Sequence, residues 1–431
     1  MLTARRDGSV TMTSQVQSDT ELMAAAAKAA GIQPPDIVQP EERWVPLNGI
    51  RFHYLDWGNP QLPHVVLLHG GSLTAHTWDM AALLLRDRYH LVALDQRGHG
   101  DTEWTPEGEL GRDNSELMLE DTRQFIEHLG YEHLTLVGMS MGGMNAIRYA
   151  ARHPERLDAL AIVDIAPETM REGLVEMEQF RQETETLRRF DDFLERAIRF
   201  MPHRAPEHLR YSLTHSLKQT EQGWTWKQDH RPRPMAELSE PERATGRAQS
   251  ADALWADVRA IRVPTILFRG ANSKILAADV AARTVAAMRD ARLVVIPRAT
   301  HNVHSDNPAD FAAALNAFLS DVLPKPETPA PMLERATAVV MRAARLVGGL
   351  ARRGDVEFRA RSLQSRLNRE YSVLGRALHP LLQDGRLTLP IDMPELRQCI
   401  TAIVGLTADL DRAREEAKQI RPAAGGPPRT T

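Results

Sequence analysis

Cysteine is nearly absent from this chain. Cys399 is the single one among 431 residues, so no internal disulfide can form. Because disulfides are common in oxidising compartments, their absence favours a reducing one. The chain also lacks an uninterrupted apolar run of about 20 residues, the length that spans a bilayer. The apolar stretch 23–30 is too short for a secretory signal, and Lys28 interrupts it. We therefore expect a cytoplasmic protein without membrane contact.

A strong excess of charge is missing as well. The formal net charge is −4 and the pI is about 6.5, which argues against a protein built around nucleic acid. No glycine-rich phosphate-binding fingerprint is visible, and the 16 histidines are scattered without the spacing of a metal site. We therefore expect neither a cofactor nor a metal ion.

What the sequence does contain is a regular alternation of strand and helix patterns. The strand-like runs lie at residues 64–68, 90–95, 134–139, 157–164, 263–270 and 291–297. Helical patterns separate most of them, which predicts an α/β fold around a mostly parallel sheet. Before the first of these runs, Asn48-Gly49 between two strand-like segments predicts a β-hairpin.

The alternation stops between residues 168 and 258, where the sequence is helical in pattern, charged and contains methionine. An insertion of this size between two strands predicts a helical cap over the carboxyl edge of the sheet, where open α/β sheets bind ligands. The core would then comprise residues 42–167 and 259–323. Residues 1–41 are rich in Ser, Thr, Gln and Ala, which predicts a flexible arm with one short helix near 21–30.

A proline-rich linker at residues 324–331 ends this region. Leucines and isoleucines at helical spacing then predict a helical extension over 332–421, followed by a disordered tail at 422–431. We expect the extension to form a homodimer by pairing with its copy. An extension that packs on the core or reaches over the cap is an open alternative, and a membrane-surface helix near 332–353 is the less favoured one.

The most informative stretch is residues 134–150. It comprises an apolar β-branched run, the turn Gly138-Met-Ser140-Met-Gly142 and an alanine-rich helical pattern. This order is typical of a nucleophile elbow, in which glycines allow a sharp strand-to-helix turn that exposes the serine hydroxyl. The first amides of the helix then point at an oxyanion formed beside Ser140. The alternative, a surface Gly/Ser turn, does not account for the strand and helix on either side.

Further motifs follow in the same order as in a known family. They are His69-Gly70-Gly71, Asp95-Gln-Arg97-Gly98-His-Gly100, Gly138-Met-Ser140-Met-Gly142-Gly143, Asp164-Ile-Ala-Pro167-Glu168, Arg269-Gly270-Ala271-Asn-Ser273 and Ala299-Thr-His301-Asn-Val-His304. With these motifs, residues 42–323 resemble the α/β-hydrolase superfamily, and more narrowly its small bacterial serine esterase-like members. The resemblance covers about two-thirds of the chain and implies the α/β-hydrolase fold.

The resemblance places a catalytic histidine after the last strand, where His301 matches and His304 is expected to be structural. The commonest position of the triad acid, the loop 271–276, has no carboxylate and carries Lys274. The remaining candidate is Asp164, at the end of the strand after the elbow helix, where some members carry their acid. Two alternatives stay open: Asp164 fixes a loop instead, or Asn272 orients the histidine.

The oxyanion hole is expected to consist of the backbone amides of Gly71 and Met141. His69, Asp95 and Arg97 are expected to stabilise loops. Several apolar or polar side chains are candidates for lining a substrate pocket, although core packing explains them equally well. They are Ser72, Trp78, Met139, Met144, Met170 and Trp224.

These features predict a serine hydrolase that cleaves a small-molecule carboxylic ester or lactone through an acyl-serine. Serine at position 140, where an aspartate would indicate epoxide or haloalkane substrates, argues against those two classes. A C–C bond hydrolase, an acyltransferase and a perhydrolase use the same triad and stay open as alternatives. Lys274 in the acid loop favours a different class, a catalytically silent ligand-binding protein of this fold.

Overall fold

The computed structural model describes residues 18–111, 113–231 and 240–323. The first 17 residues of the expected arm, the linker 324–331, the helical extension 332–421 and the tail 422–431 lie outside the described residues. The homodimer expected through the extension therefore stays a prediction.

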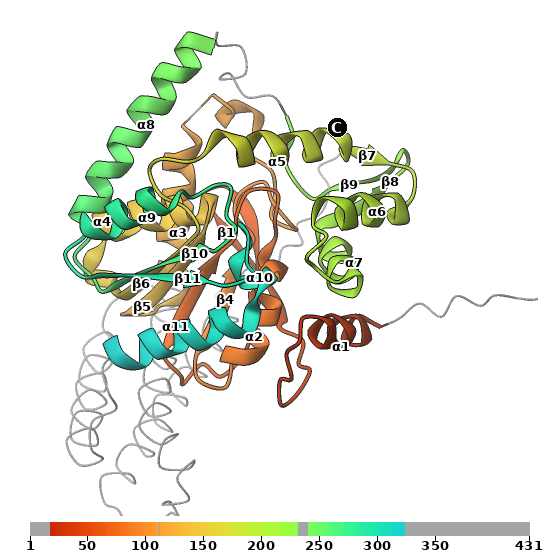
Figure 1. Ribbon diagram of the computed structural model, residues 1–431, viewed down its shortest axis with the longest axis horizontal. Coiled ribbons are helices and arrows are strands. Elements are labelled where there is room, and N and C mark those ends of the chain that lie inside the picture. Colours follow the sequence, from red (N-terminus) through yellow and green to blue (C-terminus); the bar gives the residue numbers. More distant parts are fainter. Residues whose placement is uncertain (1–17, 112, 232–239, 324–431) are drawn as a thin grey trace, which may run out of the picture.

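The core of the fold is one mixed sheet with the strand order β1-β2-β4-β3-β5-β6-β10-β11 (Figure 1). Its strands are β1 (Glu41–Leu47), β2 (Ile50–Asp56), β3 (His64–Leu68), β4 (His90–Leu94), β5 (Leu134–Met139), β6 (Leu157–Val163), β10 (Thr265–Gly270) and β11 (Ala291–Ile296). β1 and β2 pair antiparallel, as do β2 and β4, and every pairing from β4 to β11 is parallel. The predicted hairpin is confirmed, because Asn48 and Gly49 both adopt positive φ between β1 and β2.

Helices cover both faces of the sheet, so β3, β4 and β5 are buried along their whole length. Side chains alternate between two apolar layers: Val65 and Leu67 belong to one, and Val66 and Leu68 to the other. The first layer includes residues of α2 (Asp79–Leu85) and α11 (Pro308–Val322). The second includes residues of α3 (Asn114–Leu129), α4 (Met141–Arg152), α8 (Glu240–Ala260) and α9 (Ala278–Ala286). The predicted α/β-hydrolase architecture is confirmed.

The cap follows β6 and is not purely helical. It contains α5 (Arg171–Glu183), β7 (Thr186–Leu187), α6 (Phe190–Phe200), α7 (Pro206–Ser216), β8 (Leu217–Thr220) and β9 (Gly223–Trp226). The three strands form a small antiparallel sheet in the order β7-β9-β8. The cap has its own apolar cluster around Phe193 and Leu209.

The expected cap, which ended at residue 258, included most of α8. In the structure α8 belongs to the core instead, because it packs on α4 and buries Leu254 and Val258 there (Figure 1).

The N-terminal segment also differs from a flexible arm. The short helix expected there is α1 (Asp19–Ala29), and Ser18 and Glu21 form a capping box at its start. Met23 and Ala26 are fully buried, and α1 packs against α7 of the cap (Figure 1). The segment is ordered because its apolar face joins the same layer as α2 and α11.

Four short helices complete the described elements. They are η1 (Ala75–Trp78), η2 (Glu107–Glu109), η3 (Pro154–Arg156) and α10 (Val303–Asp306). Within the described ranges, every helix is too short or too polar to cross a membrane.

Candidate active site

Ser140 lies at the sharp turn between β5 and α4. Its φ is 50°, in the left-handed region that non-glycine residues rarely adopt, and its amide donates to the Val163 carbonyl at 3.0 Å. A Cβ at Gly138 would collide with the carbonyl of Gly142, and one at Gly142 with the carbonyl of Leu68. The turn therefore requires both glycines, and the predicted nucleophile-elbow geometry is present.

His301 lies in the loop after β11, and its Nδ1 is 2.8 Å from Oδ2 of Asp164. Asp164 follows β6, is fully buried and has a φ of 50°. Its Oδ1 accepts from the amide of Gly270 at 2.9 Å, and its Oδ2 also accepts from the Ser273 hydroxyl at 2.5 Å. The structure thus brings Asp164 to the histidine, as the resemblance implied.

Ser273 is a residue of this site that the sequence analysis did not single out. It lies in the loop after β10, where the family more often places its acid. Its Oγ donates to Asp164 and accepts from the amides of Ile275 and Leu276 at 3.1 and 3.0 Å. The neighbouring Asn272 is exposed, and its amide donates to the Ala299 carbonyl. Of these two loop residues, Ser273 contacts Asp164, and Asn272 does not orient the histidine.

Lys274 points away from the acid–histidine pair. Its Nζ lies 2.6 Å from Oε1 of Glu176 and 3.4 Å from Oε1 of Glu172, both on the cap helix α5. Its side chain is 54% exposed. The lysine therefore joins the loop to the cap at the surface and does not occupy the position of the missing acid.

The amides of Gly71 and Met141 are available to an oxyanion. Met141 is the first residue of α4, where helical amides have no intrahelical partner. Neither amide donates to an acceptor within the described residues. A Cβ added to Gly70 would lie 3.3 Å from Cβ of Ser140, which brings this loop close to the serine. Two amides without a hydrogen-bond acceptor in the described residues, one directly after Ser140 and one in the loop beside it, suit a developing negative charge.

Comparison with known proteins agrees with this geometry. Residues 63–308 match the family described as alpha/beta hydrolase fold. The chain is a member of that family. Esterase Rv0045c of Mycobacterium tuberculosis is 30% identical over 297 residues, which cover 67% of this chain and 91% of that protein. Its crystal structure aligns with a TM-score of 0.55 at 27% identity, covering 71% of this chain and 99% of that chain. A non-heme haloperoxidase of Rhodococcus erythropolis is 28% identical over 285 residues, or 63% of this chain and 97% of that protein.

In this α/β hydrolase, His69 fixes the loop that carries Gly71. Its Nδ1 donates to the Gly70 carbonyl at 2.7 Å, and its Nε2 accepts from the amide of Gln96 at 2.9 Å. Burial lowers the pKa of His69, so the imidazole stays neutral and keeps one donor and one acceptor. His69 thus has the structural position that the sequence predicted.

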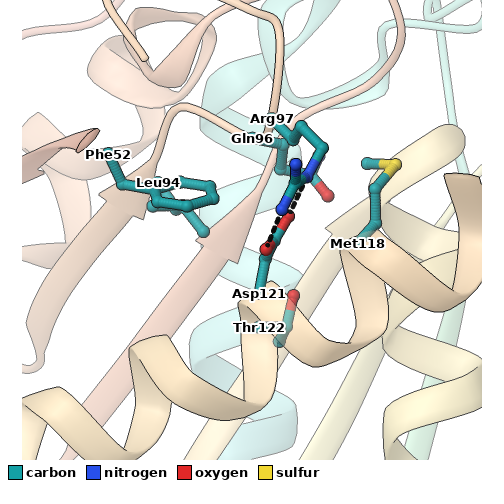
Figure 2. A pocket seen from close by; sticks show the side chains of 7 residues that line it. All are labelled: Phe52, Leu94, Gln96, Arg97, Met118, Asp121 and Thr122. Carbon is teal, nitrogen blue, oxygen red and sulfur yellow. Dashed lines mark hydrogen bonds and ion pairs between the residues drawn. The ribbon is translucent and has the colours of Figure 1, made fainter. Parts of the chain in front are cut away.

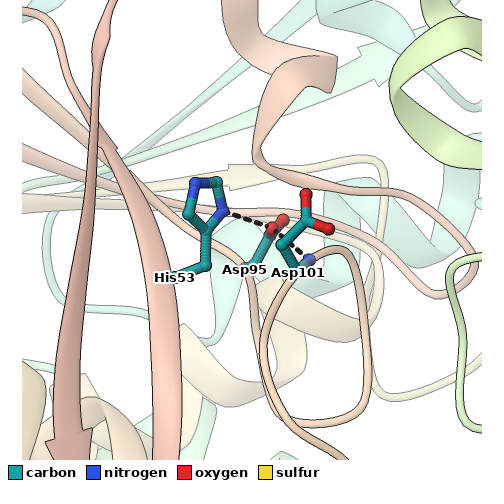
Figure 3. A group of neighbouring side chains, drawn as sticks. All are labelled: His53, Asp95 and Asp101. Carbon is teal, nitrogen blue, oxygen red and sulfur yellow. Dashed lines mark hydrogen bonds and ion pairs between the residues drawn. The ribbon is translucent and has the colours of Figure 1, made fainter.

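Asp95 likewise fixes loops around the site (Figure 3). Its Oδ2 lies 2.7 Å from His53 Nδ1 and accepts from the amide of Asp101, while its Oδ1 accepts from the amide of Ala75. Burial alone would raise the pKa of Asp95, but the hydrogen bond and charge of His53 lower it to about 2. His53, Asp95 and Asp101 lie close enough to hold a cation. The Asp95 oxygens already accept these bonds, and Asp101 pairs with Lys227, so structural contacts explain the cluster.

Arg97 is buried beside a small hollow between the loop after β4 and α3 (Figure 2). Its Nε and Nη2 donate to the two carboxylate oxygens of Asp121 at 2.7 and 2.8 Å. Ser140 and His301 do not line this hollow. Arg97 therefore stabilises the α/β-hydrolase core, as expected.

Most of the candidate pocket residues are packing residues in the structure. Trp78 and Met139 belong to the buried core, Met144 packs against the second apolar layer, and Trp224 packs on Phe190 in the cap. Packing against these neighbours explains why the four residues are apolar. Core packing was the alternative explanation that the sequence left open.

Ser72 and Met170 lie where the core meets the cap. The Ser72 hydroxyl donates to Oε1 of Gln228 at 2.7 Å, and Ser72 has a φ of 60°. The amide of Met170 donates to the Ile275 carbonyl.

His304 is buried, stacks on Trp78 at a centroid distance of 4.0 Å and lies 3.0 Å from Thr77 Oγ1, which fits the structural role expected for it.

Proposed function

We propose that this α/β hydrolase is a serine esterase that cleaves a carboxylic ester through an acyl-Ser140 intermediate. The observation that carries the proposal is the 2.8 Å contact between His301 Nδ1 and a buried Asp164, on the fold that displays Ser140 at an elbow. A histidine bonded in this way at Nδ1 has the tautomer and orientation that a general base requires.

In the proposed reaction, the Ser140 hydroxyl attacks the ester carbonyl carbon while His301 Nε2 takes its proton. The amides of Gly71 and Met141 hold the oxyanion of the tetrahedral intermediate, which collapses as His301 protonates the departing alcohol. Water, deprotonated by His301, then attacks the carbonyl carbon of the acyl-serine. The bond between the acyl carbon and Ser140 Oγ breaks as His301 returns the proton to Oγ, which releases the acid and restores the serine. Asp164 keeps the imidazole oriented and stabilises its protonated form, without becoming protonated itself.

Ester hydrolysis is preferred because the similar protein from Mycobacterium tuberculosis is named an esterase. A lactone is a cyclic ester and follows the same steps, so it belongs to the proposal. The position of Lys274, paired with cap glutamates, removes the reason that the sequence offered for a silent binding protein. The substrate is expected to be a small molecule.

Labelling with a fluorophosphonate probe tests the proposal, with intact mass as the readout. We expect one adduct on the wild type, none on Ser140→Ala, and labelling of Asp164→Asn slowed by at least 100-fold, because the wrong histidine tautomer is costly. A panel of p-nitrophenyl esters and lactones then defines the class. A wild type that folds but takes no label and cleaves no ester would contradict the proposal and favour the binding protein.

A further inference from the structure

A buried ion pair joins the cap to the loop that carries His301. Arg204 lies in the turn between α6 and α7, and its guanidinium donates from Nε to Oδ1 of Asp306 at 3.1 Å and from Nη2 to the same oxygen. Nε2 of His203 lies 3.2 Å from that oxygen. The Asp306 side chain is fully buried, and that of Arg204 is 6% exposed. The pair is therefore shielded from solvent and salt.

The second oxygen of Asp306 holds the backbone next to the histidine. Its Oδ2 accepts from the Thr300 amide at 2.8 Å and from the Thr300 hydroxyl at 2.5 Å. On the other side, a Cβ at Gly270 would collide with the carbonyl of Thr300, so the loop also lies tightly against the end of β10. The position of His301 is thus set by β10 from one side and by Asp306 from the other.

The charge on Asp306 depends on its partners. Burial alone would raise the pKa of this carboxyl, but the charge of Arg204 and hydrogen bonds from His203 and Thr300 hold it well below its usual range. A buried carboxylate that loses its partner is strongly destabilised. Other ion pairs between cap and core, such as Lys227–Asp101 and Lys274–Glu176, are substantially exposed. Surface pairs of that kind contribute little.

We propose that Arg204 is a positioning residue, which places the His301 imidazole by holding Asp306 and, through it, Thr300. The inference rests on the proposed catalytic role of His301. It makes the cap part of the catalytic machinery, because the docking of the cap then determines where the general base lies. A misplacement of about 1 Å in such a group costs about 100-fold in rate.

The test compares full-length variants by their rate of fluorophosphonate labelling and by its final extent. Arg204→Met removes the guanidinium. The double variant Arg204→Met/Asp306→Asn leaves no uncompensated buried charge. If the single variant fails to fold, the double variant tests whether the pair positions His301. Arg210→Met is the matched control, because it removes an exposed ion pair of the cap, to Asp191. The extent reports the folded fraction and the rate constant reports positioning, so a purely structural role would lower the extent alone.

We expect the rate constant to fall at least tenfold in the double variant and in any folded Arg204→Met, and to be unchanged in Arg210→Met. A second readout is the Nδ1–H proton resonance of His301 in histidine-labelled protein, assigned by its loss in His301→Ala. It should shift in the double variant and not in the control. A wild-type rate constant and an unshifted resonance in the double variant would overturn the inference. If the wild type takes no label, the proposed function fails, and the resonance alone decides the inference.

Discussion

At the scale of single residues, the site depends on how its buried carboxylate is held. Asp164 accepts from the Gly270 amide and the Ser273 hydroxyl in addition to its contact with His301. Gly270 ends β10, and Ser273 lies in the loop after it, the loop that more often supplies the acid itself. This loop supports the carboxylate, and the carboxylate itself comes from the end of β6.

Ser273→Ala tests this support. The change removes a hydrogen bond to a buried charged group and leaves the amides of Ile275 and Leu276 without their acceptor. We expect kcat for a p-nitrophenyl ester to fall about tenfold with little change in KM, and the free energy of unfolding to fall by about 1–3 kcal/mol. Steady-state kinetics and urea unfolding measure the two effects.

Ser216→Ala is the control for that variant, because its hydroxyl donates to a carbonyl within the cap helix α7. Its kcat should equal that of the wild type. An unaltered kcat in Ser273→Ala would show that Gly270 and His301 suffice to hold Asp164.

At the scale of elements, the elbow is a strand, a turn and a helix packed without spare room. α4 begins directly after Ser140, and the amide of Gly142 donates to the carbonyl of His69 at 3.1 Å. This bond places the start of α4 against the loop that carries Gly71. Ser140, the proposed nucleophile, and both proposed oxyanion donors therefore lie around one tight contact between the start of α4 and this loop.

Gly142→Ala should break this contact. The added methyl group would collide with the carbonyls of Leu68, the last residue of β3, and of His69, which follows it. We expect the free energy of unfolding to fall by about 3 kcal/mol or more, since neither backbone can move without disturbing β3. Gly108→Ala is the matched control, because a Cβ there meets no atom within 4 Å, and it should change stability by at most about 0.5 kcal/mol. Equal melting temperatures for the two variants would contradict the steric argument.

At the scale of the whole molecule, the cap is attached to the core at several separate places. Arg204 contacts the histidine loop, Gln228 contacts Ser72, and α7 packs against α1 at the N-terminal end of the described chain. Gln228 also forms a backbone bridge with His99. Two of these attachments reach loops of the candidate site, the one that carries His301 and the one that carries Gly71, so a change in cap docking would affect both loops.

Two buried histidines close to Arg204 make the stability of the protein depend on pH. Burial and then the charge of Arg204 lower the pKa of both His208 and His304 to about 3. Between pH 6.5 and 3 the unfolded chain therefore binds protons that the folded protein does not, and stability falls as the pH falls through this window. Each group contributes a slope of about 1.4 kcal/mol per pH unit.

Replacing one of these histidines should reduce that slope. We expect the free energy of unfolding of His208→Gln to change with pH, between pH 6 and 4, by about 1.4 kcal/mol per pH unit less than that of the wild type. Urea unfolding at several pH values measures the slope. A slope equal to the wild type would mean that His208 is accessible to protons in the folded protein.

Much of the fold followed from local patterns. The Asn48-Gly49 hairpin, the buried apolar strands and the glycines of the elbow depend on neighbours in the chain, and the structure contains each of them. The pocket candidates were harder to place, because a large apolar residue looks the same in a sequence whether it lines a cavity or fills a core. Trp78 and Met139 fill the core.

The sequence by itself determined the alternation of strands and helices and the elbow at Ser140, because strand periodicity and the Gly-x-Ser-x-Gly turn are short-range properties. The α/β-hydrolase fold and the position of His301 followed from the resemblance of its motifs to that family. Only the tertiary structure decided which polar group meets His301, what supports Asp164 and how Arg204 reaches the histidine loop. Those contacts join residues about 100 or more positions apart. No local pattern records them, because they arise when the parallel strands end at one edge of the sheet and the cap folds back over it.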